Sequence, residues 1–399
     1  MSLLSFFVEN KWVLLFYGLI VLLVYLNRHR FQVQNKIIMM YKTKIGLGLM
    51  DRIGVRHAEL VKFVAYCGIG IGFAGMLLIF YTLIKNLISL LSVPDAQSAV
   101  SLIVPGIALP GSPIKIPLIS GWIALFFVIL VHEFSHGIVA RAHNLAVKSS
   151  GIFFFGPLMG AFVEPEEKKL LASPDTTQYS VYAAGPFSNI LLAIFAILIL
   201  SYALTPIVSA LTVPVGVTLA GVSDKYPSQA AGLASGMLIT QLNSKNITNY
   251  EEFQSGLSCV KPGDTVSLVA NGTLYTIVAA AHPEKPDKGY LGVLASSAAT
   301  RELKTKNVFT NLAYPVLLWI VELFYILAIL SLGIGLANLL PLGPVDGGRM
   351  TQTALERTKG KERGAVWWKK LTIITFFILI INLFWPLIKW VGGLLGLLM

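Results

Sequence analysis

The chain has 399 residues, of which 55% are hydrophobic and only 13% carry a charge. A soluble globular domain carries about 25% charged residues. This composition therefore excludes an ordinary soluble enzyme, a disordered chain and a disulfide-rich secreted domain. The net charge is +11, from Lys+Arg 31 against Asp+Glu 20. Because a lipid bilayer accommodates large apolar surfaces, the composition predicts a polytopic membrane protein.

Six apolar stretches approach the length of about 20 residues that a membrane-spanning helix needs. They are 12–27, 63–84, 118–142, 179–203, 311–340 and 370–392. Each is predicted to be a helix, since lipid admits only helices or closed barrels and these runs lack the alternation of barrel strands. The first stretch is not expected to be a cleaved signal peptide, because no basic region precedes its apolar core.

Lysine and arginine concentrate in three of the connections between these stretches. Segments 28–62, 141–178 and 341–370 are rich in both residues, whereas the short connections on the opposite side hold few. The positive-inside rule therefore predicts that these three segments are cytoplasmic and that both chain ends are extracytoplasmic. We expect an integral membrane protein, located in the plasma membrane.

The long segment 204–310 has the pattern of a separate extracytoplasmic domain. From Val213 to about Ser297, short β-type runs such as Thr265–Val269 and Thr273–Val278 alternate with turn residues and two short helical stretches. The predicted parts of the chain are two N-terminal spans with a basic loop (1–117), the first part of a helical membrane core (118–212), an external α+β domain (213–300), and the rest of the core with the last span (301–399).

The strongest chemical signal is the run His132-Glu133-Phe134-Ser135-His136. On a helix, residues four apart share one face, so both imidazoles can bind one tetrahedral metal ion while Glu133 lies beside it as a general base. The run lies in an apolar helix, where ionisable groups are costly and usually functional. The alternative is a polar cluster that merely connects helices.

Two histidines leave a zinc site one protein ligand short. Asp346 is the candidate, because it closes the fifth apolar stretch at the predicted depth of the histidines, after prolines that interrupt the helix. The alternative is an exposed aspartate in a helix-ending turn. Asn189 is another polar residue within an apolar stretch. It would hydrogen-bond a substrate backbone or a developing oxyanion, or it would only join helices.

Together these residues resemble the site-2 protease family of intramembrane zinc metalloproteases. The resemblance rests on His132–His136, on Gly185-Pro-Phe-Ser-Asn189, and on Asn338-x-x-Pro341 through Asp346-Gly347, and it covers roughly residues 118–345. It implies Zn²⁺ as the cofactor, bound by both histidines and Asp346, with Glu133 and Asn189 as catalytic residues. The implied partners are the lipid bilayer and single-pass transmembrane substrates, first cut by another protease, and no nucleic acid.

The resemblance extends to the external domain, which looks like a PDZ module. Ser228-Gln-Ala-Ala-Gly-Leu, Gly236-Met-Leu-Ile and Tyr290-Leu-Gly-Val293 are similar to PDZ motifs in a circularly permuted order, although a PDZ domain usually has Gly-Asp where this chain has Gly-Met. Such a domain would either exclude substrates with bulky external parts or recruit trimmed ones. The sequence leaves both roles open.

The family also carries a cytoplasmic β-hairpin that re-enters the membrane, and Ser149–Val163 fits that description. Its strand edge would pair with an unwound substrate segment, or the hairpin would only pack on the core. Gly156 and Gly160 in the hairpin, together with Asn338, are implied as substrate-binding residues.

The sequence thus predicts a zinc-dependent endopeptidase that cleaves transmembrane segments by attack of a metal-activated water, with its active site toward the cytoplasm. A membrane metal transporter is one alternative. It needs a second metal site and similar halves, which the sequence does not show, although the intramembrane acid Glu322 has no assigned role. A catalytically inactive PDZ scaffold is the other alternative, and the intact Glu133 argues against it.

Overall fold

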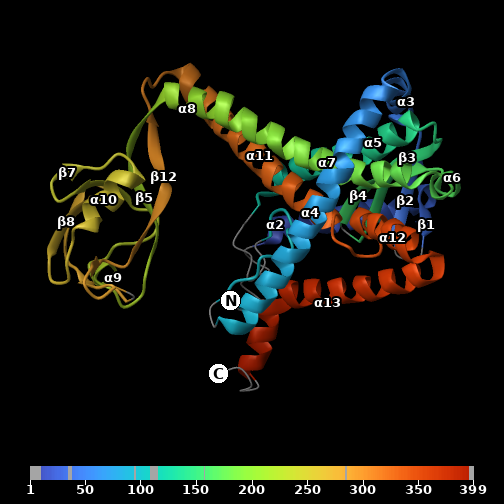
Figure 1. Ribbon diagram of the computed structural model, residues 1–399. Coiled ribbons are helices and arrows are strands. Elements are labelled where there is room, and N and C mark those ends of the chain that lie inside the picture. Colours follow the sequence, from blue (N-terminus) through green and yellow to red (C-terminus); the bar gives the residue numbers. More distant parts are fainter. Residues whose placement is uncertain are drawn as a thin grey trace. The chain divides into compact units, whose positions relative to one another are not determined.

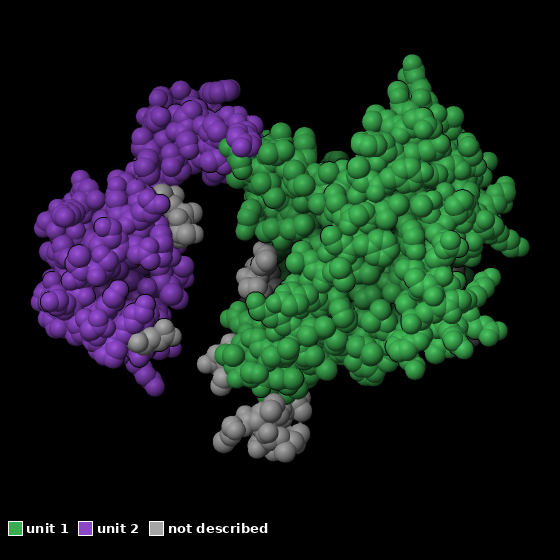
Figure 2. Space-filling model, in the orientation of Figure 1, with its two compact units in different colours: residues 1–201, 319–399 green, residues 202–318 purple. Residues whose placement is uncertain are grey.

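The computed structural model describes residues 10–34, 38–93, 96–107, 116–156, 158–283 and 285–394. These residues form two compact units, shown in different colours in Figure 2. The first unit, within 1–201 and 319–399, contains most of the apolar helices and a four-stranded sheet. The second unit, 202–318, contains a six-stranded sheet.

Five helical stretches are long and apolar enough to cross a membrane. They lie in α4 (Ala58–Ser92), α5 (Leu118–Ala142), α7 (Asp175–Ile199) with its continuation through η2 (Leu200–Leu204) and α8 (Thr205–Leu211), α11 (Val308–Asn338) and α13 (Lys361–Leu394). Many of their large apolar side chains are exposed, as expected of side chains that face lipid. The prediction of a polytopic helical membrane protein with an inserted β-rich region is confirmed.

The first apolar stretch forms a helix of the length predicted from the sequence. Its helix, α2 (Lys11–Leu26), has 16 residues. That length is about 24 Å, less than the ~30 Å hydrocarbon core of a bilayer. The turn η1 (Arg28–Arg30) follows it with three basic side chains. Among the described residues, five helices are therefore long enough to span a membrane and α2 is a shorter apolar helix, so the sixth span stays a prediction.

Glycines allow close packing around α7, which contacts α4, α5 and α12 (Asp346–Lys359) (Figure 1). A Cβ added at Gly68 of α4 would lie 2.8 Å from the ring of Phe187 on α7. One added at Gly72 would lie 3.1 Å from the terminal carbon of Met350 on α12. Small residues at such positions let membrane helices approach closely. Helix α4 thus supports both α7 and α12.

The sheet of the first unit lies beside α5 and has the order β1-β2-β3-β4, all antiparallel. Its strands are β1 (Gln32–Gln34), β2 (Ile38–Thr43), β3 (Val147–Phe155) and β4 (Leu158–Pro165). The predicted hairpin 149–163 is confirmed as β3 and β4. The pairing of β2 with β3 was not expected, since it joins segments far apart in sequence. Among the described strands, β4 pairs only with β3, so its other edge lacks a strand partner.

Two short helices flank the membrane core. Helix α3 (Leu47–Arg56) contacts α5, and its Gly54 approaches Ile138 so closely that an added Cβ would lie 2.6 Å from that carbonyl oxygen. Helix α6 (Glu167–Leu171) connects β4 with α7. Both belong to the basic connections recognised in the sequence.

The second unit is built on a sheet whose main path is β12-β5-β6-β8-β9, with β7 paired to β6. Its elements are β5 (Thr212–Val222), α9 (Pro227–Ala230), β6 (Leu238–Leu242), β7 (Lys245–Asn246), α10 (Tyr250–Ser258), β8 (Thr265–Ala270), β9 (Thr273–Val278), β10 (Ala280–Ala281), β11 (Gly289–Tyr290) and β12 (Val293–Leu303). A buried apolar cluster that includes Ile239 and Leu268 forms its core. The unit extends beyond the expected segment 213–300 at both ends, since it includes α8 and the first part of α11.

Candidate metal centre

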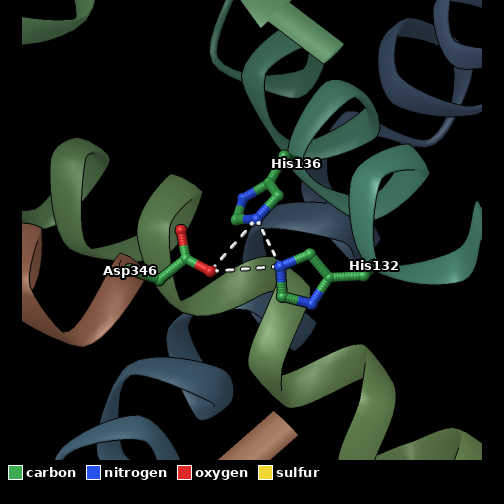
Figure 3. A group of neighbouring side chains, drawn as sticks. All are labelled: His132, His136 and Asp346. Atoms are coloured by element: carbon green, nitrogen blue, oxygen red, sulfur yellow. Dashed lines mark hydrogen bonds and ion pairs between the residues drawn. The ribbon is translucent and has the colours of Figure 1, made fainter. Parts of the chain in front are cut away.

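Three predicted ligands converge on one point (Figure 3). Asp346 Oδ2 lies 3.2 Å from His132 Nε2 and 3.4 Å from His136 Nε2, and the two ring nitrogens are 3.3 Å apart. Ligands bound at ~2.0–2.1 Å to a tetrahedral zinc ion are about 3.3–3.4 Å from each other. The group therefore fits Zn²⁺ in both its donor atoms and its spacing.

Helix α5 brings the two imidazoles together, since His132 and His136 lie one turn apart on its inner face. The side chain of His132 is buried and that of His136 nearly so. Nδ1 of His136 lies 2.7 Å from the carbonyl oxygen of Val181 on α7. This contact leaves Nε2 of His136 directed at the metal position, as acceptors around metal-binding histidines commonly do.

Asp346 begins α12, directly after the loop that ends α11. The next two residues must be glycine, because the loop folds back on itself. A Cβ added at Gly347 would lie 2.2 Å from the carbonyl oxygen of Leu339, and one at Gly348 would lie 2.1 Å from that of Leu342. This tight turn directs the carboxylate toward the imidazoles, so Asp346 is not the exposed turn residue of the alternative interpretation.

Gly185 is a site residue whose role the sequence did not reveal. A Cβ added there would lie 2.3 Å from Nε2 of His136 and 2.6 Å from Nε2 of His132. Any side chain at this position of α7 would therefore occupy the space beside the ligand nitrogens. The available signal was the position of Gly185 at the start of the Gly-Pro-Phe-Ser-Asn run, but its proximity to the ligands depends on how α7 packs against α5.

Glu133 lies next to the ligands but outside their converging group. Its Oε2 accepts a hydrogen bond from the backbone N–H of Val163 on β4, at 3.0 Å. Glu133 and both histidines line a cavity of about 710 Å³, together with Asn338. The structure thus brings the predicted base and one predicted substrate-binding residue into the same cavity as the metal ligands.

The two predicted hairpin glycines lie elsewhere. Gly156 occupies the β3–β4 turn with a φ of +59°, a conformation that favours glycine, and it does not line the metal-site cavity. Gly160 lines a neighbouring apolar cavity of about 360 Å³, which Glu133 also reaches. A Cβ at Gly160 would lie 2.4 Å from the ring of Phe153. Packing within the hairpin therefore requires Gly160 to be glycine.

Asn189 is fully buried on α7. Its side-chain amide lies 3.1 Å from Nδ1 of His132, on the far side of that ring from the metal position. Asn189 lines neither of the two cavities that Glu133 reaches. The structure therefore places its amide against a metal ligand. Glu322 joins no metal-binding group among the described residues.

Charged pairs also line the larger cavity. Lys42 forms an ion pair with Glu164 at 2.8 Å, and Arg349 forms one with Glu167 at 3.2 Å. The hydrogen bond from Lys42 holds the pKa of the Glu164 carboxyl below its ordinary value, with help from the hydroxyl of Ser149. These charges make part of the lining of this cavity polar, in contrast to the apolar cavity beside Gly160.

Comparison with known proteins agrees with this site. The model of a family described as peptidase family M50 matches residues 120–382. The chain is 30% identical over 237 residues to the uncharacterized protein MJ0971 of Methanocaldococcus jannaschii, a match that covers 58% of this chain and 56% of that protein.

Two further relatives have names that describe proteases. The chain is 26% identical over 239 residues to the regulator of sigma-W protease RasP of Bacillus subtilis, covering 50% of this chain and 55% of that protein. It is 23% identical over 265 residues to the zinc metalloprotease RasP of Shouchella clausii, a match that covers 55% of this chain and 62% of that protein. The matches thus span little more than half the length of these relatives.

The family match includes the helices that carry both histidines, Glu133 and Gly185, and the turn that carries Asp346. It covers more than half of the chain, and it agrees with the resemblance to site-2 proteases inferred from the sequence motifs. The chain belongs to peptidase family M50.

Proposed function

We propose that this protein is a zinc-dependent intramembrane endopeptidase of the site-2 type. The observation that carries the proposal is the group formed by His132, His136 and Asp346, with ligand atoms at zinc spacing in a core of membrane-length helices. Membership of peptidase family M50 supports a peptidase, and the name of the Shouchella clausii relative supports zinc.

In the proposed reaction the metal ion and Glu133 would have separate roles. A zinc ion held by His132, His136 and Asp346 would act as a Lewis acid and would lower the pKa of a bound water to about 7. Glu133 would take a proton from the attacking water and deliver it to the nitrogen of the leaving amine. The N–H of Val163 fixes one carboxylate oxygen of Glu133, so the base is held at the cavity wall before substrate arrives.

The substrate would bind along β4 as an extended strand. Each peptide group in a helix is hydrogen-bonded internally, so a transmembrane helix must unwind locally before its carbonyl can be attacked. The edge of β4 without a strand partner offers backbone groups to such a segment. Val163 of that strand contacts Glu133, so pairing there would bring the substrate backbone to the base. Helix-breaking residues in the substrate should therefore favour cleavage.

The five spanning helices support the proposed orientation. With the basic connections in the cytoplasm, α4, α5, α7, α11 and α13 cross alternately and leave the second unit and the C-terminus outside. The hydroxyl of Tyr17 on α2 donates to the carbonyl of Pro105, in the connection between α4 and α5 that this orientation places outside. The basic turn η1 at the other end of α2 leads into the sheet. In this proposal α2 crosses as a sixth span, and the N-terminus faces outward as well.

We also propose that the second unit acts as an extracytoplasmic PDZ-like domain. The motif around Ser228 forms α9, and Ser228 donates its hydroxyl to the carbonyl of Leu291 in the loop after β11, at 2.6 Å. That loop precedes β12 and lies within Tyr290–Val293, one of the PDZ-like motifs recognised in the sequence. Substrates would be single-pass proteins whose external part another protease has removed.

The test uses the full chain purified in detergent, with a tagged single-pass transmembrane segment that contains a helix-breaking Gly-Pro pair. Glu133→Gln should keep the zinc content near one ion per chain, because Glu133 is not a ligand, while cleavage falls by orders of magnitude. Glu322→Gln is the matched control, since it changes another acid of a spanning helix that joins no metal group among the described residues. Cleavage that survives in Glu133→Gln would overturn the mechanism, and zinc-free protein would overturn the metal assignment.

A further inference from the structure

The side-chain amide of Asn189 contacts His132 at the ring nitrogen that faces away from the proposed metal position. It lies 3.1 Å from Nδ1 of His132, while Nε2 of the same ring lies 3.2 Å from Asp346. The side chain of Asn189 is 0% exposed, and its Oδ1 is buried without a hydrogen-bond partner. In this arrangement the amide nitrogen faces the ring nitrogen.

Metal binding decides which of these two groups is the donor. A metal takes the lone pair of Nε2, so the single proton of a neutral His132 ring lies on Nδ1, which becomes a donor. An amide N–H₂ facing that N–H would place two donors against each other. Rotating the amide by about 180° exchanges its oxygen and nitrogen with almost no change in shape. It then presents Oδ1 to the N–H of His132.

We infer that Asn189 is a positioning residue that accepts a hydrogen bond from Nδ1–H of His132 through Oδ1. The contact holds the imidazole in the tautomer and orientation in which Nε2 is free for the metal. The inference rests on the proposed zinc site and gives Asn189 a different task from the oxyanion contact predicted from sequence.

The second histidine provides an internal comparison. Nδ1 of His136 lies 2.7 Å from the carbonyl oxygen of Val181, which can only accept a hydrogen bond. That ring is therefore held by an acceptor from α7. Asn189 lies two turns further along the same helix, so α7 would supply one acceptor to each imidazole. Acceptors of this kind orient histidine ligands and raise their basicity.

Helix α11 holds Asn189 in place. The hydroxyl of Ser331 donates to the backbone carbonyl of Asn189 at 2.8 Å, and this contact is buried. A Cβ added at Gly335 would lie 3.1 Å from the Cβ of Asn189, so the two helices are in close contact here. These contacts fix the backbone and the Cβ of Asn189, and the residue is fully buried.

The test measures zinc affinity of the full chain in detergent by competition with a chromophoric chelator. Asn189→Leu keeps the approximate shape and removes the acceptor, so zinc affinity should fall by about 10–100-fold. Asn189→Asp keeps an acceptor oxygen and should hold zinc within about threefold of the unsubstituted chain, since a carboxylate serves in the same position in many zinc sites.

The matched control is Asn382→Leu on α13. Asn382 is also 0% exposed with an unpaired Oδ1, but no contact joins it to a ligand of the metal. It should change stability without changing zinc affinity. Equal losses of zinc affinity in both leucine variants would overturn the inference, as would unchanged affinity in Asn189→Leu or a loss in Asn189→Asp as large as in Asn189→Leu.

Cleavage at saturating zinc separates positioning from an oxyanion contact. A positioning role predicts that cleavage by Asn189→Leu recovers largely as zinc is raised. A lasting loss of kcat, with zinc affinity unchanged, would assign Asn189 to the oxyanion and overturn the inference. Zinc affinity is measured without any substrate, so an absence of proteolysis would count against the proposed function and leave this measurement intact.

Discussion

Trp368 donates its indole N–H to the backbone carbonyl of Gly348 across 2.9 Å. Trp368 lies on α13 and Gly348 in the first turn of α12, two residues after Asp346. One turn further along α13, Thr372 lies 3.3 Å from the position of a Cβ at Gly343 in the preceding loop. The last apolar helix, whose role the motifs did not settle, thus holds the turn that presents the carboxylate ligand.

Trp368→Phe should weaken the zinc site without removing it. The variant keeps an aromatic ring but leaves the carbonyl of Gly348 without this donor, which costs about 1 kcal/mol. We expect a modest loss of thermal stability and a several-fold loss of zinc affinity, measured by chelator competition. The neighbouring Trp367→Phe is the control, since Trp367 is 51% exposed. Identical behaviour of the two variants would show that the indole hydrogen bond does not support the site.

Gly185→Ala should abolish zinc binding while the helices remain folded. Its new methyl group would lie 2.3 Å from Nε2 of His136, which forces the imidazoles or α7 to move. Elemental analysis and circular dichroism of the purified variant measure the two effects. Gly333→Ala on α11 should retain zinc, because nothing lies within 4 Å of its added Cβ. Normal zinc content in Gly185→Ala would contradict the geometry of the site.

Asp346→Ala should lose both zinc and cleavage, because two imidazoles alone hold the ion weakly. Treating the unsubstituted chain with a chelator should also remove zinc and cleavage. Added zinc should restore cleavage in the chelator-treated chain but not in Asp346→Ala. Asp175→Ala removes an exposed ion pair with Arg357 and should leave both properties intact. Full metal occupancy in Asp346→Ala would place the third ligand elsewhere.

Replacement of residues 213–297 by a short Gly/Ser linker should spare zinc binding. The ligands all lie in the first unit, and the second unit has its own apolar core. If the domain excludes bulky substrates, the deletion should allow cleavage of substrates that keep a large external domain. If it recruits trimmed substrates, their cleavage should fall while a generic one is cut as before. Matched substrates with and without a bulky domain measure this, and unchanged cleavage of all of them would remove both roles.

The two histidine ligands of the metal centre could be predicted from the sequence because their arrangement depends on local spacing. His132 and His136 share a helix face whatever that helix packs against, and their place in an apolar stretch marks them as functional. Helix periodicity and hydropathy likewise predicted the main spanning helices. The hairpin was predicted from the resemblance to the family, and its two strands lie close together in the sequence on either side of the turn at Gly156.

Contacts between distant segments decided the rest. Motif order and membrane depth named Asp346 as the candidate ligand, but its carboxylate reaches the imidazoles because Gly347 and Gly348 permit a tight turn that α13 then holds. No local pattern shows that Gly185 lies against the ligand nitrogens, or that Asn189 faces the back of His132. The pairing of β2 with β3 was equally hidden. Such features follow from how whole helices and strands pack, because packing brings together residues whose separation in the chain carries no information about their distance in space.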